Sequence, residues 1–318
     1  MKKLTILALA VCSIVAVDFV IPKVLPLVNK DNYFLGFEKF LTKAEQTKGQ
    51  KRIILVGGSS LAWGVSAEQL TQSLGVLTLN SGIAAGVGYK NFFRNIDGVV
   101  NKKTDIFVIS PEYSIVSESG LLHRSKEFCY IAIYVRDTLP FDCVGYSLSQ
   151  LFNVSPLLNR NKKVAANEEY LRNGFNDFGD YVYRPIRQQE LDLESLEKCN
   201  DVNLYDLRKN YIPFIEKLLA DGYNIVYIPN FLPDVSCADS SKIDGFHSVL
   251  YEEFGVPPFV DQQLLFDEEY FYNTAYHLTN KGVGVKTAIF HNHLYQLINS
   301  RLLGSDNPQN ADTTSKNW

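Results

Sequence analysis

The chain has 318 residues, of which 46% are hydrophobic and 21% charged, a composition that excludes an intrinsically disordered protein. Lysine and arginine number 31 against 35 aspartate and glutamate residues, so the net charge is −4. Because no basic run is longer than a pair, the charge pattern does not favour a nucleic-acid partner. The length allows one large α/β domain or two small ones.

An apolar segment at residues 4–21 follows two lysines at the N-terminus. As a helix it would extend about 27 Å, close to the ~30 Å hydrocarbon thickness of a bilayer. The lysines in front of it predict a cytoplasmic N-terminus and an exported body. We therefore expect residues 1–23 to be an uncleaved signal anchor. A cleaved signal peptide is the alternative, although no convincing A-x-A site follows an apolar core of adequate length.

Export would place the four cysteines that follow the apolar segment in an oxidising space. These four residues are Cys129, Cys143, Cys199 and Cys237. They allow three pairings, and the sequence does not choose among them. Two disulfides and four buried thiols both fit this pattern. The absence of a C-x-x-C motif or a cysteine–histidine cluster from the sequence disfavours a structural zinc site.

Short apolar runs alternate with helical patterns in the first third of the chain, after a helix expected at residues 33–47. Strands are predicted at residues 52–57, 76–80 and 105–110. The helices between them are predicted at residues 66–74 and 89–100. This alternation of strand and helix predicts a parallel sheet with crossover helices.

The alternation stops at residues 112–200, where we expect an aromatic-rich insertion that caps the domain. It returns in the last third of the chain, with a helix predicted at 204–220, a strand at 224–229 and a closing helix at 283–303. The expected organisation is a membrane anchor, a juxtamembrane segment at 24–50, one α/β domain at 51–303 and a disordered polar tail at 304–318.

Polar residues stand directly after the three early strands, and open parallel sheets bind ligands at the carboxyl ends of their strands. Ser59 follows the first strand, Gly82 follows the second, and Glu112 with Tyr113 follows the third. A serine in a sharp strand-to-helix turn presents its hydroxyl and places N–H groups around an oxyanion. Glycine and serine are also ordinary turn residues, so a purely structural turn is the alternative.

The residues around Ser59 and Gly82 resemble two sequence blocks of the SGNH (GDSL-like) hydrolases. Residues 57–64, GGSSLAWG, match the block that carries the nucleophilic serine, which implies that role for Ser59. Ser60 follows it, and the N–H of Ser59 or Ser60 is expected to donate to the oxyanion together with a glycine N–H. Residues 80–86, NSGIAAG, match the block in which a glycine N–H donates to the oxyanion hole, the role implied for Gly82.

A third block near the C-terminus completes the resemblance. Residues 276–282, YHLTNKG, match the block that carries the general-base histidine, the role implied for His277. The family fold implied is a three-layer α/β/α, flavodoxin-like parallel sheet, here with an inserted cap and an N-terminal membrane anchor. Within the superfamily, the chain looks most like membrane-anchored proteins that act beside polysaccharide O-acetylation and teichoic-acid D-alanylation machinery.

The third strand departs from the family pattern, which offers an asparagine to the oxyanion hole after that strand. Here Glu112 and Tyr113 stand at this place, and we expect them, with Ser60, to contact the substrate. A carboxylate that points inward would oppose a developing oxyanion. The alternative is that Glu112 and Tyr113 only support a loop.

The acid that orients the histidine is also missing. The positions four and three residues before His277 hold Asn273 and Thr274. We expect Asn273 to hold the imidazole by a hydrogen bond, although an amide supplies no charge. The alternative is that a nearby carboxylate takes this role, and the candidates are Asp267, Glu268 and Glu269.

The resemblance implies an extracytoplasmic serine esterase or O-acyltransferase that acts on a cell-envelope polysaccharide through a Ser59 acyl-enzyme. The acyl group is expected to be O-acetyl and to be presented by a membrane partner, and neither a metal nor an organic cofactor is needed. The expected location is the cell membrane, with a single pass and the main domain in the periplasm or outside the cell. The alternatives are a catalytically inactive glycan-binding or scaffold protein with the same fold, and a secreted lipase-like enzyme.

Overall fold

The computed structural model describes residues 33–113, 129, 131–132, 170–183, 202–237, 241–254 and 264–305. The expected anchor at residues 1–23, most of the expected cap and the tail from residue 306 lie outside these described residues. Among the described helices, none combines the length and the apolar character that crossing a membrane requires.

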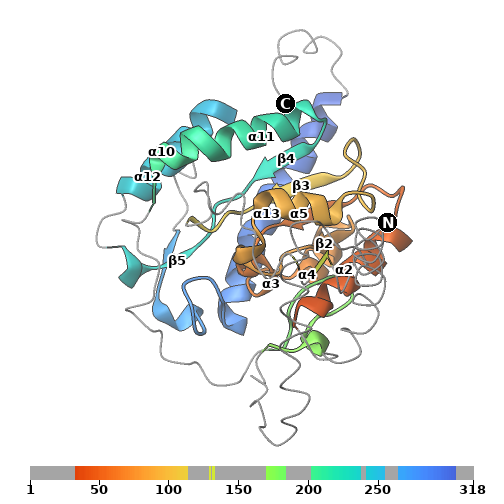
Figure 1. The fold of residues 1–318 in the computed structure, drawn as a ribbon, viewed down its shortest axis with the longest axis horizontal. Coiled ribbons are helices and arrows are strands. Elements are labelled where there is room, and N and C mark those ends of the chain that lie inside the picture. Colours follow the sequence, from red (N-terminus) through yellow and green to blue (C-terminus); the bar gives the residue numbers. More distant parts are fainter. Residues whose placement is uncertain are drawn as a thin grey trace, which may run out of the picture.

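A four-stranded parallel sheet forms the centre of the fold (Figure 1). In spatial order its strands are β2 (Thr78–Asn80), β1 (Ile53–Val56), β3 (Ile106–Ile109) and β4 (Asn224–Tyr227). In register, Ile53 of β1 lies opposite Thr78 of β2 and Ile106 of β3, and Ile106 lies opposite Asn224 of β4. The four strands and the parallel sheet predicted from the sequence are confirmed, with slightly shorter strands.

Helices cover both faces of this sheet, which explains why β1 and β3 read as continuous apolar runs. Ile54 and Val56 point into a large hydrophobic cluster on one face, and Ile53 and Leu55 point into a smaller cluster on the other. The helices that pack into the larger cluster are α2 (Phe37–Gln46), α5 (Tyr89–Ile96) and α11 (Ile212–Ala220). Those that pack into the smaller one are α4 (Ala67–Leu74) and α13 (Asn280–Ser305).

The first described helix belongs to this folded unit. It begins with the 3₁₀ turn η1 (Tyr33–Gly36), and Phe37 and Phe40 of α2 are buried in the larger cluster. The helix predicted at residues 33–47 is therefore confirmed. The described part of the expected juxtamembrane segment packs against the sheet.

The other predicted helices are also present. The Ser66 side chain caps α4 by accepting from the Gln69 N–H, and Gly75 ends it with a φ of 66°. The helix predicted at 204–220 consists of α10 (Leu204–Asp206), a π-helical segment η8 (Leu207–Tyr211) and α11. The closing helix α13 begins three residues before the predicted start.

Several elements were not predicted. They are the short helix α3 (Ser59–Ala62), the helix α12 (Ser241–Phe254), and a parallel pair of strands, β5 (Leu232–Pro233) and β6 (Leu265–Phe266). Strands of two residues carry too little alternation to be recognised. Within the described residues, the remaining 3₁₀ turns are η2 (Ala85–Val87), η6 (Arg172–Gly174), η9 (Asp234–Ser236) and η10 (Glu268–Tyr270).

Two of the four cysteines expected in the exported body lie within the described residues. Cys129 and Cys237 are each disulfide-bonded. This decides against free thiols at these two positions, one of the two alternatives left by the sequence. Cys143 and Cys199 lie outside the described residues.

A fully buried ion pair joins the residues that precede β1 and β3. Two parallel hydrogen bonds connect Arg52 to Asp105, from Nε to Oδ1 at 3.1 Å and from Nη2 to Oδ2 at 2.7 Å. The remaining guanidinium hydrogens find acceptors on Ala44, Thr47 and Val99, and the Asn101 N–H donates to Asp105. Both buried charged groups therefore have hydrogen-bond partners for most of their donors and acceptors at the amino ends of these strands.

We expect Arg52→Leu to lower the free energy of unfolding by about 3–5 kcal/mol, because the Asp105 carboxylate would remain buried without its counter-charge. Urea unfolding of both proteins measures this loss. The double variant Arg52→Leu/Asp105→Leu should recover part of it. If the double variant were several kcal/mol less stable than Arg52→Leu, the unpaired Asp105 carboxylate would not be the cause of the loss.

Candidate active site

Ser59 is the first residue of α3, directly after the turn that follows β1. The preceding Gly58 is extended, and the Trp63 N–H closes the short helix by donating to the Ser59 carbonyl at 2.8 Å. Ser59 itself is half-buried, whereas Ser60 is fully buried. The structure thus places Ser59 at the carboxyl end of β1, as the sequence predicts.

Gly82 lies against the same turn because it has no side chain. A Cβ at this position would come within 2.8 Å of the Gly58 carbonyl oxygen, the Ala62 nitrogen and the Leu61 Cβ. Only glycine allows this close approach of the segment after β2. The Gly82 N–H, expected in the oxyanion hole, donates to Asn80 Oδ1 at 3.0 Å.

The Glu112 carboxylate lies directly at the Ser59–Ser60 turn. Its Oε1 accepts from the Ser60 N–H at 2.9 Å and from the Ser59 hydroxyl at 3.4 Å. The side chain is 4% exposed, and burial raises its pKa above the ordinary value, against the opposing effects of the Ser60 hydrogen bond and the charge of Lys286. Glu112 therefore occupies the Ser60 N–H, one of the expected oxyanion donors.

Lys286 of α13 binds the same turn from its other side. Its Nζ donates to the Ser60 carbonyl at 3.0 Å and to Asn230 Oδ1 at 2.6 Å. The residue is 1% exposed, and burial lowers its pKa to about 7, although the negative charge of Glu112 acts in the opposite direction. The sequence analysis did not identify Lys286. The available signal was a lysine within the buried stripe that Val283, Phe290 and Leu294 form on the closing helix.

His277 is held in one orientation by Asn273. Its Nδ1 lies 2.9 Å from Asn273 Oδ1, while Asn273 Nδ2 donates to the Tyr170 hydroxyl at 3.3 Å. Because Oδ1 is an acceptor, Nδ1 carries the imidazole proton and Nε2 carries the lone pair, an assignment made from the hydrogen-bond network. The predicted hydrogen bond between Asn273 and the histidine is confirmed.

Two of the other residues near the histidine, Thr274 and Glu269, have different partners. The Thr274 hydroxyl accepts from the backbone N–H of His277 at 3.0 Å. Glu269 pairs with Lys281 near the start of α13. The partners described for Nδ1 are therefore Asn273 and the Tyr170 hydroxyl, which lies 3.5 Å away.

Trp63 links the serine and histidine segments. Its ring stacks on the His277 ring, with centroids 4.7 Å apart and an interplanar angle of 14°, and its backbone binds the Ser59 carbonyl. The fold thus brings the predicted Ser59, Gly82 and His277 segments to one region. The hydrogen bond described for the Ser59 hydroxyl goes to Glu112 and not to His277.

Tyr113 is buried behind this site. Its hydroxyl donates to the Asn230 carbonyl at 2.9 Å and lies 3.2 Å from His247 Nε2. Its N–H donates to the Tyr276 hydroxyl at 3.0 Å. At 1% exposure, the Tyr113 side chain packs in the protein interior, as in the loop-supporting alternative.

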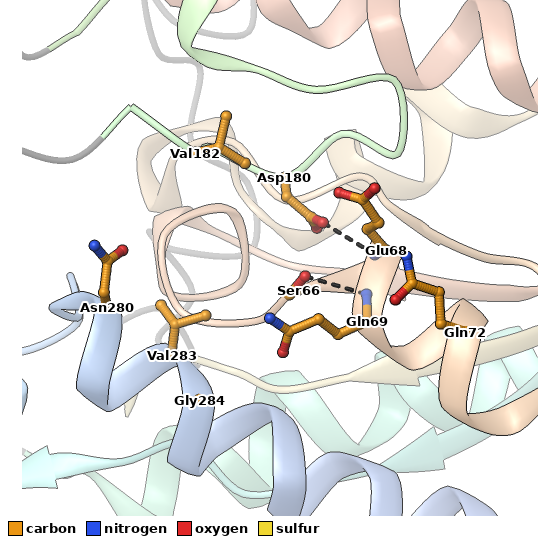
Figure 2. Close-up of a pocket in the computed structure, with 9 residues that line it drawn as sticks. All are labelled: Ser66, Glu68, Gln69, Gln72, Asp180, Val182, Asn280, Val283 and Gly284. Carbon is orange, nitrogen blue, oxygen red and sulfur yellow. Dashed lines mark hydrogen bonds between the residues drawn. The ribbon is translucent and has the colours of Figure 1, made fainter.

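A cavity of about 440 Å³ opens between α4 and α13 (Figure 2). Figure 2 shows Asp180 and Val182 on one side of it and the α13 residues Asn280, Val283 and Gly284 on the opposite side. The α4 end contributes Ser66, Glu68, Gln69 and Gln72. The cavity therefore presents carboxamide, carboxylate and hydroxyl groups over a small apolar surface.

The Asp180 carboxylate is already saturated with donors. They are the Ala67 and Glu68 N–H groups, at 2.9 and 3.1 Å, and the side chains of Asn80 and Asn176, at 3.0 and 3.3 Å. Asp180 thus caps α4 and holds Asn80, the residue that accepts the Gly82 N–H. Asp180 therefore has a structural role at the start of α4.

Comparison of the chain with protein-family models, with curated proteins and with solved structures found no match. The assignment of a function therefore depends on the chemistry and geometry of the residues described above.

We expect His247, which contacts Tyr113, to make the stability of the protein depend on pH. Burial lowers its pKa from the ordinary 6.5 to about 4. The imidazole therefore binds a proton more tightly in the unfolded chain than in the folded protein. The stability that the neutral His247 contributes is complete above pH 6.5 and is lost as the pH falls towards 4. At ~1.4 kcal/mol per pH unit, the loss amounts to about 3 kcal/mol.

Urea unfolding at a series of pH values measures this contribution in wild type and His247→Gln. The variant should lose less stability between pH 6.5 and 4 than wild type. His291→Gln, which removes a half-buried imidazole from the middle of α13, is the matched control for the loss of a histidine elsewhere in the fold. An unchanged slope in His247→Gln would show that His247 does not cause the dependence.

Proposed function

We propose that this protein is an extracytoplasmic serine esterase or O-acyltransferase of the SGNH type that acts on a cell-envelope polysaccharide through Ser59. The observation that carries the proposal is the orientation of His277. Because Asn273 Oδ1 accepts from Nδ1, the basic nitrogen of the ring is Nε2, the arrangement that a serine hydrolase requires. The spatial strand order 2-1-3-4 supports the flavodoxin-like architecture on which the proposal depends.

In the proposed reaction, His277 Nε2 takes the proton of the Ser59 hydroxyl as Oγ attacks the carbonyl carbon of an acyl donor. The tetrahedral intermediate then collapses, the bond to the donor oxygen breaks, and the leaving oxygen receives the proton from His277. In the second half-reaction, a glycan hydroxyl or water gives its proton to His277 Nε2 as its oxygen attacks the acyl carbon. The bond between that carbon and Ser59 Oγ then breaks, and Oγ regains the proton from His277. Transfer to the glycan makes the protein an O-acyltransferase, and transfer to water makes it an esterase.

The reaction requires a rearrangement of the expected oxyanion hole. The N–H groups of Ser60 and Gly82 donate to Glu112 and Asn80 in this structure. Substrate has to displace these acceptors before the same N–H groups can stabilise an oxyanion, and each missing donor costs roughly 3–4 kcal/mol. The same observation favours the second candidate function, a catalytically inactive glycan-binding or scaffold protein.

Other features support the proposed location and substrate. The disulfides at Cys129 and Cys237 suit an oxidising space outside the cytoplasm. An N-terminal anchor at residues 1–23 would hold the domain beside a membrane partner that presents the acyl group. The carboxamides of Gln69, Gln72 and Asn280 in the cavity both donate and accept hydrogen bonds, which suits the hydroxyl groups of a glycan.

A fluorophosphonate probe tests the proposed acyl-enzyme on the full-length, detergent-solubilised protein. Intact-mass spectrometry should detect one adduct on wild type and none on Ser59→Ala. His277→Ala should slow labelling by about 10³-fold or more, because the serine loses its base. The control is Ser73→Ala, which removes an exposed hydroxyl on α4 and should leave labelling unchanged.

The absence of an adduct on folded wild-type protein would contradict the acyl-enzyme. The second candidate function would then be tested by binding of isolated envelope polysaccharide, with the same variants. Labelling that survives in Ser59→Ala would identify a different nucleophile.

Glu112→Gln separates the charge of this side chain from its hydrogen bond. The amide oxygen still accepts from the Ser60 N–H, but the negative charge beside the developing oxyanion is gone. We expect labelling of Ser59 to become about tenfold faster, which corresponds to ~1.4 kcal/mol in the barrier. Slower labelling would show instead that the carboxylate assists Ser59.

A further inference from the structure

Tyr170 contacts both members of the histidine–asparagine pair, although it lies more than one hundred residues away in the chain. Its hydroxyl oxygen accepts from Asn273 Nδ2 at 3.3 Å and lies 3.5 Å from His277 Nδ1. Its ring packs against Trp63 and Tyr33, with centroid distances of 5.3 and 5.7 Å. The hydroxyl is therefore held in place by aromatic packing on the same ring that stacks on His277.

We propose that Tyr170 is a positioning residue that sets the tautomer of His277 through Asn273. The amide of an asparagine has an acceptor and a donor end, and only the acceptor end at Nδ1 leaves the lone pair on Nε2. With Asn273 Nδ2 directed at the Tyr170 oxygen, the Asn273 oxygen faces the imidazole. Reversal of the amide would place the lone pair on Nδ1 and leave Nε2 protonated.

The Tyr170 oxygen also compensates in part for the missing carboxylate of a Ser-His-Asp triad. When His277 takes a proton, Nδ1–H faces two oxygen atoms, Asn273 Oδ1 and the Tyr170 hydroxyl. Both are neutral, but their partial negative charges lie in a largely buried site, where such dipoles have a strong effect. The Asn273 and Tyr170 oxygens together thus take the place of the aspartate charge of a triad. The importance of this role for catalysis rests on the proposed function, whereas the tautomer does not.

The tautomer is measured directly by two-bond ¹H–¹⁵N correlation on full-length protein labelled with ¹⁵N-histidine. His277→Gln identifies the signals of His277. We expect a protonated Nδ1 in wild type and a mixture of both tautomers in Tyr170→Phe, which keeps the ring and removes only the hydroxyl. Tyr183→Phe removes an exposed hydroxyl from the same segment and should leave the tautomer unchanged.

Two results would overturn the proposal. One is a wild-type His277 with its proton on Nε2, and the other is a Tyr170→Phe protein with the wild-type tautomer. The labelling rate at Ser59 gives a second readout, and it should fall about tenfold in Tyr170→Phe but not in Tyr183→Phe. A tautomer shift in a protein that never reacts with the probe would support the role of Tyr170 and contradict the proposed acyl-enzyme.

Asn273→Asp provides the matched test of coupling. A carboxylate fixes Nδ1–H by its charge, so the imidazole pKa should rise and the tautomer should no longer depend on Tyr170. Tyr170→Phe should therefore have several times less effect on the tautomer and on labelling in the Asn273→Asp background. Equal effects in both backgrounds would show that Tyr170 does not act through Asn273.

Discussion

The turn at Ser60 depends on two buried groups of opposite charge. Glu112, which follows β3, accepts the Ser60 N–H, and Lys286 of the last helix donates to the Ser60 carbonyl. One peptide segment thus joins the first strand, the third strand and α13. Burial opposes the charged form of both side chains, and each charge favours the other. Because His277 precedes α13 by only a few residues, its position beside the Ser59 turn depends on this connection.

An aromatic cluster around Trp63 provides the second constraint on the site. The Trp63 ring stacks on both Tyr181 and His277, and its Nε1 donates to the Tyr33 hydroxyl at 3.1 Å. The cluster therefore joins the first described helix, the segment at residues 170–183 and the histidine loop. Such packing partly shields the hydrogen bonds between His277, Asn273 and Tyr170 from solvent, which strengthens them.

The two constraints have different consequences for the proposed chemistry. The aromatic cluster holds His277 in the orientation of a general base, which favours catalysis. The hydrogen bonds of Glu112 and Asn80 occupy the N–H groups that an oxyanion would need, which opposes catalysis until substrate displaces them. A Ser59 enzyme with this resting geometry would react only after its substrate has rearranged the turn.

The sequence by itself determined the elements whose signals are local. The apolar runs of β1 and β3 and the cap of α4 at Ser66 predicted a parallel sheet and its helices, because burial on both faces and capping depend on nearby residues. The resemblance to the SGNH hydrolases implied roles for Ser59, Gly82 and His277, and it also pointed to Asn273, four residues before the histidine.

Only the tertiary structure decided the partners of these residues. Glu112 at the Ser60 N–H, the buried Lys286 and the Tyr170 hydroxyl beside Asn273 all come from distant parts of the chain. Hydrogen bonds between such residues leave no periodic pattern, since they depend on how the strands and helices meet rather than on the conformation of either segment. For the same reason, the sequence indicated which residues gather at the carboxyl ends of the strands. It did not indicate that the N–H groups of Ser60 and Gly82 already donate to side chains.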